Sequence, residues 1–313
     1  MEWYYILLII IASLILLILL TSLICFFLTF YSTENNKHKK DIYLPDGEQY
    51  NFYRPIIHQG IEEAKKMKYI EMSIKSFDGL TLKGKYYELE KGLPMEIMFH
   101  GYKGSGERDL SAGIKRAHLC KRNALVVDQR AHGDSDGKII SFGINEAKDC
   151  LKWIDHCIKY FGEDQKILIT GISMGAATVM NATKYDLPKN VVGILADCGY
   201  DSAKNIIKKT IKEMHLPANI MYPFVKLGAR IFGRFNLEEN SPIEAIKNCK
   251  LPIFFIHGKA DDFVPYYMSK NVYDVCPSTK QIVFIENAGH GIAYLVDPKK
   301  YLDELENFFS YTK

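Results

Sequence analysis

The N-terminal part of the chain has a different hydrophobic pattern from the rest. Residues 3–33 include no charged side chain and consist mostly of Ile, Leu and Phe. About 20 apolar residues are enough for a helix to cross the hydrocarbon core of a bilayer, and this run is longer. It also exceeds the apolar stretch of about 7–15 residues in a cleaved signal peptide, and the only charged side chain before it is Glu2. The pattern therefore predicts a retained membrane-spanning helix.

The residues after this run indicate its orientation. Lys37, Lys39 and Lys40 follow it closely, and basic residues next to a membrane helix favour the cytoplasmic side. We expect a single-pass protein of the cell membrane with its main domain in the cytoplasm; an extracytoplasmic domain is the alternative. Residues 34–66 are polar and mixed, contain Pro45 and Pro55, and show a short helical pattern near 61–67. They are expected to form a linker or a collar next to the membrane.

From residue 67 onward, short apolar strands alternate with amphipathic helices. A hairpin is predicted at 69–77 and 80–89, because Asp78-Gly79 between alternating strands suits a tight turn. Apolar strands follow at 96–99, 124–127, 167–170, 191–196, 253–256 and 281–285, with helices between them that include 145–160 and 298–311. Such a pattern predicts an α/β domain over 67–313, with a mostly parallel sheet and helices on both faces. Ligands bind such sheets beyond the carboxyl ends of the strands.

Composition narrows the function classes. A chain of 313 residues can hold one large α/β domain and an appendage, and a formal charge of +3 gives no indication of nucleic-acid binding. The seven cysteines are spread singly, without a C-x-x-C motif or metal-like spacing. We expect reduced thiols in the core and no metal site.

The sequence Gly171-Ile172-Ser173-Met174-Gly175 follows a predicted strand and precedes a predicted helix at 176–185. A serine on so sharp a turn has a strained backbone, its neighbours two residues away crowd together, and glycine relieves that crowding. The hydroxyl is left exposed above the sheet, beside the N–H groups of the helix N-terminus. Ser173 is therefore the candidate nucleophile.

A glycine-rich loop, residues 100–106, follows the strand at 96–99. Its expected role is to donate one backbone N–H, that of Tyr102, to an oxyanion; the second donor would be the N–H of Met174. The loop matches neither glycine-rich motif of nucleotide-binding proteins.

The remaining candidates follow two later strands. Asp261 lies in the loop after 253–256, and His290 lies between two glycines after the last strand. An aspartate there can orient a histidine that acts as a base, and His290 is the only histidine beyond Asp261. Of the adjacent aspartates we choose Asp261, and expect Asp262 to be a surface acid or a helix cap.

At these residues the chain resembles the α/β-hydrolase superfamily, over about residues 67–313. The Gly171–Gly175 motif resembles its nucleophile elbow, His257-Gly258-x-x-Asp261-x-x-Val264-Pro265 the acid loop of its esterase and serine-aminopeptidase-like branches, and His100-Gly101 its oxyanion loop. Residues 128–137 (Asp-Gln-Arg-Ala-His-Gly-Asp-Ser-Asp-Gly) are similar to its D-x-R-G-H-G-x-S-x-G segment, with Ala131 in place of a glycine. The resemblance implies a structural role there, so His132 is given no catalytic role. The N-terminal helix is similar to that of the membrane-tethered Bem46-like hydrolases.

In this superfamily a lid is inserted where residues 200–245 lie. Residues 201–235 combine many Lys and Arg side chains with apolar ones. We expect an amphipathic cap that covers the substrate and touches the anionic leaflet near the anchor, or an ordinary cap with a solvated basic face.

Together these features predict a membrane-anchored serine hydrolase that needs no metal or organic cofactor. The first expectation for the substrate is a small-molecule carboxylic ester, including a lipid-like acyl ester or thioester, because the cap is apolar and the anchor brings the site to lipids. A short peptide, as in serine aminopeptidases, is the alternative. A non-catalytic membrane-bound interaction module and cofactor-free peroxidase chemistry are two further alternatives.

Overall fold

The computed structural model describes residues 2–32 and 47–310. At its centre is an eight-stranded sheet with the order β1-β2-β4-β3-β5-β6-β7-β8. The strands are β1 (Ile70–Lys75), β2 (Thr81–Tyr87), β3 (Met95–Phe99), β4 (Asn123–Val127), β5 (Ile167–Ile172), β6 (Val191–Asp197), β7 (Ile253–Gly258) and β8 (Lys280–Ile285). Antiparallel pairing is confined to β1–β2 and β2–β4, and the other pairs are parallel. The expected mostly parallel α/β sheet is confirmed.

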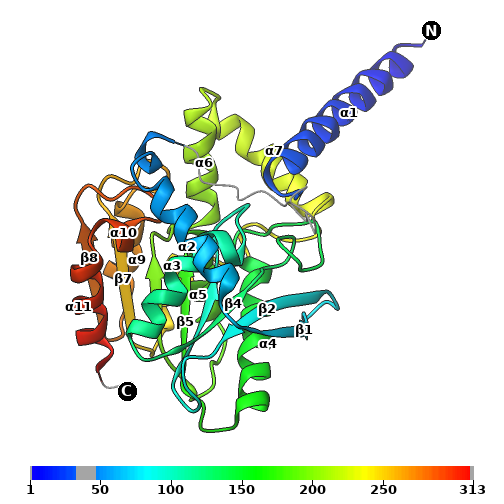
Figure 1. Ribbon diagram of the computed structural model, residues 1–313. Helices are drawn as coiled ribbons and strands as arrows, with labels where there is room; N and C mark the ends of the chain where they lie inside the picture. The colour runs from blue at the N-terminus through cyan, green and yellow to red at the C-terminus, as the bar shows by residue number, and fades with distance from the viewer. Residues whose placement is uncertain (1, 33–46, 311–313) are drawn as a thin grey trace.

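Helices cover both faces of this sheet (Figure 1). On one face, α3 (Gly106–Leu119) and α11 (Pro298–Phe308) pack against apolar side chains such as Met98 and Phe254. On the other lie α4 (Ile144–Phe161), α5 (Met174–Ala182) and α9 (Tyr267–Val275), around a core that includes Ile97 and Trp153. The helix expected at 145–160 corresponds to α4, and the strands of the sheet and the helices expected at 176–185 and 298–311 begin and end within a few residues of their expected positions.

The apolar N-terminal run forms α1 (Trp3–Thr29), which projects away from the body of the molecule (Figure 1). Among the described residues it is the one helix long and apolar enough to cross a membrane, with a mean hydropathy of 3.2. The helix ends earlier than the apolar run, because the next residues pair with a loop of the body: Ser32 N–H donates to the Lys138 carbonyl, and Tyr31 bridges to Ile139.

The last turns of α1 pack on α7 (Ala218–Ile231). A Cβ on Gly228 would lie 2.5 Å from the carbonyl oxygen of Ser22, so the two helices touch through their backbones. Phe26 and Phe30 are buried in this contact, and the Phe30 ring lies 5.3 Å from that of Phe235. The base of α1 is thus part of a core shared with the rest of the protein.

The stretch expected to form a linker or a collar, residues 34–66, contains two folded elements in its described part. Residues 33–46 lie outside the described part, but the remainder forms a 3₁₀ turn, η1 (Glu48–Tyr50), and the helix α2 (Arg54–Lys66), which packs on α3. The helical pattern expected at 61–67 is therefore the end of a longer helix. Pro55 lies in the first turn of α2, where proline is tolerated because its missing N–H would have no intrahelical acceptor.

Between β6 and β7 the chain forms the cap, which contains α6 (Ala203–Glu213), α7 and α8 (Pro242–Ala245) with the 3₁₀ turn η2 (Ile246–Asn248). Ser202 caps α6 by accepting from the Asn205 N–H. Pro242 occupies the first turn of α8, but the Ser241 side chain makes no cap hydrogen bond. One more short helix, α10 (Ala293–Val296), follows β8.

Candidate active site

Ser173 lies on the turn between β5 and α5, in a backbone conformation that L-residues rarely adopt (φ 57°, ψ −117°). The expected crowding is present: a Cβ on Gly171 would lie 2.1 Å from the Gly175 backbone, and one on Gly175 would lie 1.9 Å from the Phe99 carbonyl oxygen. Glycine at both positions therefore lets the strand, the turn and the helix come this close together.

The structure brings the three predicted side chains into one hydrogen-bonded chain. The Ser173 Oγ lies 2.9 Å from Nε2 of His290, and Nδ1 of His290 lies 2.7 Å from Oδ2 of Asp261. The carboxylate is an acceptor, so we assign the proton of His290 to Nδ1, which leaves Nε2 to accept from the serine hydroxyl. The histidine is thereby in the tautomer that a general base requires.

Asp261 is held by donors on both of its oxygens. Oδ1 accepts from the N–H groups of Phe263 (3.0 Å) and Val264 (2.8 Å), and Oδ2 faces His257 Nε2 at 3.1 Å as well as His290. Burial alone would raise the pKa of Asp261, but the two histidines and these hydrogen bonds hold its pKa well below the usual range. The carboxylate is therefore ionised near neutral pH.

His257 was not predicted as part of the site. Its Nε2 faces two acceptors, the Asp261 carboxylate and the Val264 carbonyl, so this nitrogen carries a proton. The signal was present in the sequence, because the histidine opens the acid loop four residues before Asp261. Asp262, by contrast, is exposed and accepts from Gln49 Nε2 (2.7 Å), in keeping with a surface acid.

The glycine-rich loop lies against the nucleophile: a Cβ on Gly101 would lie 3.5 Å from the Ser173 Cβ. Four of its N–H groups are already bonded: Gly101 donates to Asp109, Lys103 to His132, Gly104 to the Gly101 carbonyl, and Gly106 to Asp128. In the described part of the chain, the N–H of Tyr102 is left without a protein acceptor. The N–H of Met174, the first residue of α5, likewise has no intrahelical acceptor.

Residues 128–137 pack against the glycine-rich loop (100–106) and hold it in place. His132 is fully buried and its Nε2 accepts from the Lys103 N–H; burial, with His100 nearby, lowers its pKa to about 3. Arg130 is buried between Asp149 and Asp78. Ala131 has φ 65°, which explains why glycine is usual at this position.

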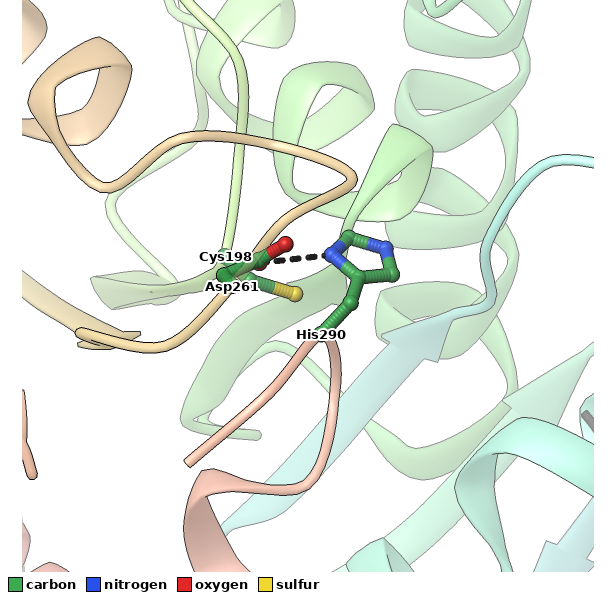
Figure 2. A group of neighbouring side chains, drawn as sticks. All are labelled: Cys198, Asp261 and His290. Carbon is green, nitrogen blue, oxygen red and sulfur yellow. Dashed lines mark hydrogen bonds and ion pairs between the residues drawn. The ribbon is translucent and has the colours of Figure 1, made fainter. Parts of the chain in front are cut away.

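Beside Asp261 and His290 lies a buried thiol, Cys198, which directly follows β6 (Figure 2). Its sulfur, an Asp261 oxygen and a His290 nitrogen lie within 4.8 Å of one another, a donor set that could in principle hold a metal ion. However, the Asp261 oxygen and the His290 nitrogen are only 2.7 Å apart. Two ligands at about 2.1 Å from one tetrahedral ion lie about 3.4 Å apart. The Asp261 and His290 atoms therefore have the spacing of a hydrogen bond and not of two ligands to one metal ion. Burial and nearby carboxylates also keep the pKa of the Cys198 thiol well above its usual value.

A cleft of about 660 Å³ opens over Ser173 and His290. Its walls come from η1, α2, α3, α6 and the loops that carry the acid and the histidine. The apolar side chains that line the cleft include Ile57, Tyr102, Ile172, Phe263, Ile292 and Leu295. The participation of η1 and α2 was not predicted, because their residues carry no motif.

Comparison with known proteins identifies the family. The sequence pattern of the prolyl oligopeptidase family matches residues 141–312, more than half of the chain. Among curated proteins, YqkD of Bacillus subtilis, described as uncharacterized, is 26% identical over 256 residues, which cover 80% of this chain and 82% of YqkD. Protein bem46 of Schizosaccharomyces pombe is 23% identical and matches 69% of this chain and 68% of its own length.

Among solved structures, the esterase Pf2001 of Pyrococcus furiosus superposes with a TM-score of 0.64 at 22% sequence identity, over 80% of this chain and 93% of the esterase. This likeness shows the α/β-hydrolase fold. The chain belongs to the prolyl oligopeptidase family of α/β-hydrolases.

Proposed function

We propose that the protein is a serine hydrolase that cleaves a carboxylic ester through an acyl-enzyme. The observation that carries this proposal is the continuous chain from the Ser173 hydroxyl through His290 to Asp261, with contacts of 2.9 Å and 2.7 Å. A hydroxyl, an imidazole in the base tautomer and an ionised carboxylate in this order form an activated nucleophile.

In the proposed reaction, Ser173 Oγ attacks the ester carbonyl while His290 Nε2 takes its proton. The N–H groups of Tyr102 and Met174 stabilise the negative charge that develops on the carbonyl oxygen. His290 then gives the proton to the leaving alcohol, and Asp261 stabilises the imidazolium throughout. A water molecule, deprotonated by His290, attacks the acyl-enzyme and releases the carboxylic acid and free Ser173.

The substrate class is inferred from the cleft. Apolar side chains that line the cleft over Ser173 suit the acyl part of an ester, and the esterase-like fold agrees with this choice. A short peptide is the second candidate, favoured by the family whose sequence pattern the chain matches. We expect no nucleic acid among the partners.

We further propose that α1 anchors the enzyme in the membrane. Its 27 residues span about 40 Å, about 10 Å more than the hydrocarbon core of a bilayer. The excess corresponds to the turns that pack on α7, so the bilayer would begin close to the cap. The lysines at 37, 39 and 40 favour a catalytic domain on the cytoplasmic side.

The test of the nucleophile uses the full chain in detergent with a fluorophosphonate probe, which reacts with activated serines. We expect labelling of the wild type and of Ser241→Ala, whose hydroxyl makes no cap hydrogen bond to its helix, and none of Ser173→Ala. A folded wild type that does not label would contradict the proposal and favour a non-catalytic interaction module.

The substrate class is tested by comparing kcat/KM for p-nitrophenyl esters of increasing acyl length with that for aminoacyl p-nitroanilides. Preference for an ester supports the first candidate, and preference for an anilide supports the second. Sidedness is tested by protease treatment of sealed, right-side-out membrane vesicles: a cytoplasmic domain is protected until the membrane is opened, whereas an extracytoplasmic one is cleaved at once.

A further inference from the structure

We propose that Gln49 and Tyr50, in the 3₁₀ turn η1, are positioning residues that hold His290 in register with Asp261 and Ser173. The inference rests on the proposed function and adds to it a part of the chain that precedes the α/β-hydrolase domain recognised in the sequence. We call the pair the η1 brace.

The brace binds both main-chain polar groups of His290. The His290 N–H donates to Gln49 Oε1 at 2.7 Å, and the Tyr50 hydroxyl donates to the His290 carbonyl at 2.9 Å. These residues are separated from His290 by 241 and 240 positions in the chain. Two consecutive side chains from a distant segment therefore fix the peptide groups on either side of the base.

Gln49 also joins the histidine loop to the acid loop. Its Nε2 donates to Oδ1 of Asp262 at 2.7 Å, next to Asp261. One amide group thus spans the two loops whose side chains meet in the contact between Asp261 and His290. Gly289 makes room for it, since a Cβ there would lie 1.9 Å from Gln49 Oε1.

The loop that carries His290 needs such support. It leaves β8 at Ile285 and turns through left-handed residues at Asn287 (φ 58°) and Gly291 (φ 70°), so it makes no regular ladder with the sheet. A peptide group without a partner in a partly buried site loses the free energy of its hydrogen bond with water. The brace supplies both missing partners and thereby selects one loop conformation.

Within the brace, Tyr50 has the burial expected of a fixed element. Tyr50 is buried and lines the cleft, and burial together with the nearby Cys198 and Asp261 raises the pKa of its hydroxyl well above the usual value, so the hydroxyl keeps the proton that it donates. Because a misplacement of about 1 Å can cost a hundredfold in rate, loss of the brace is expected to slow the reaction. The segment between the apolar helix and the hydrolase domain is then part of the active site.

The test measures kcat and KM for p-nitrophenyl acetate with the full chain in detergent. Gln49→Ala and Tyr50→Phe are each expected to lower kcat by roughly tenfold to hundredfold with KM little changed. Gln49→Glu combined with Asp262→Asn keeps an acceptor for the His290 N–H and an amide donor between the two loops without facing two carboxylates, and is expected to recover part of the rate. The matched controls are Gln59→Ala, which removes an exposed amide on α2, and Tyr53→Phe, and both should behave as wild type.

A second measurement separates positioning from general stability. In a His290→Ala background the residual rate no longer depends on where the histidine lies, so adding Gln49→Ala should leave it unchanged. An equal loss in both backgrounds, a rise in KM alone, or rates equal to the controls would overturn the proposal. Tyr50→Phe keeps the buried ring, so it provides the test if Gln49→Ala does not fold. Wild-type protein that neither labels with the probe nor hydrolyses ester refutes the proposed function itself, a result distinct from active protein that is insensitive to these changes.

Discussion

Replacing Asp261 by asparagine tests the assignment of the acid most directly, because the amide can satisfy only one side of its site. If the amide oxygen faces the N–H groups of Phe263 and Val264, the NH₂ group faces the nitrogens of His290 and His257. His290 can adapt by moving its proton to Nε2, where it can no longer accept from Ser173. The backbone N–H groups cannot adapt, so this inactive arrangement is favoured.

The geometry gives the size of the effect. To keep the active tautomer, the variant must turn its NH₂ group toward two backbone N–H groups, which are then unsatisfied. At about 1–3 kcal/mol for each unpaired donor, the active form lies about 2–6 kcal/mol above the inactive one. At 1.36 kcal/mol for each tenfold change, kcat should fall by about 30-fold to 26,000-fold.

The assay is the kcat of Asp261→Asn for p-nitrophenyl acetate, with Asp262→Asn as the neighbouring control. Asp262 is exposed, and asparagine there keeps an acceptor for Gln49, so the control should remain within about threefold of wild type. A loss below tenfold for Asp261→Asn, or a larger loss for Asp262→Asn, would show that the carboxylate of Asp261 is not what sets the histidine tautomer.

Three further predictions concern the fold around the site. Gly171→Ala puts a Cβ against the Gly175 backbone at 2.1 Å and is expected to destabilise the fold by about 1–3 kcal/mol and to lower kcat about a hundredfold, measured by urea unfolding and ester hydrolysis. Glu96→Gln leaves two buried arginines without their carboxylate and should cost about 3–5 kcal/mol in unfolding free energy, against less than about 1 kcal/mol for the half-exposed Glu107→Gln. Because the folded pKa of Asp261 is lowered, its contribution to stability is complete above about pH 4 and is lost as pH falls further; the unfolding free energy of wild type should therefore drop more steeply than that of Asp261→Asn between pH 5 and pH 3.

The sheet and the motif residues could be predicted because their signals are local. Apolar strands alternating with amphipathic helices indicated the order of elements, and the glycines around Ser173 indicated a turn that the structure forms. Because ligand-binding loops follow the carboxyl ends of parallel strands, we expected Asp261 and His290 at the same edge of the sheet. These inferences need only the period of the pattern and the chemistry of a few residue types.

The η1 brace could not be predicted in this way. Gln49 and Tyr50 lie in a polar stretch without periodicity, and their role comes from contacts with a loop about 240 positions away. Likewise, the full length of α2 could not be predicted, because a proline such as Pro55 is typical of a helix only when it lies in the first turn. In both cases tertiary contacts, rather than local propensity, decide the structure.

The contact between α1 and α7 determines where a water-soluble fragment of this protein can begin. Removing the whole apolar run, with a start at residue 34, would also remove Phe26 and Phe30. It would uncover Phe232, which packs on Phe26, and Phe142 and Phe235, which pack on Phe30. An exposed aromatic patch of this kind favours aggregation. The boundary of the folded unit therefore lies inside α1, near Ser22. An expression fragment that begins there keeps Phe26 and Phe30 in the core and lacks most of the exposed apolar surface of the helix.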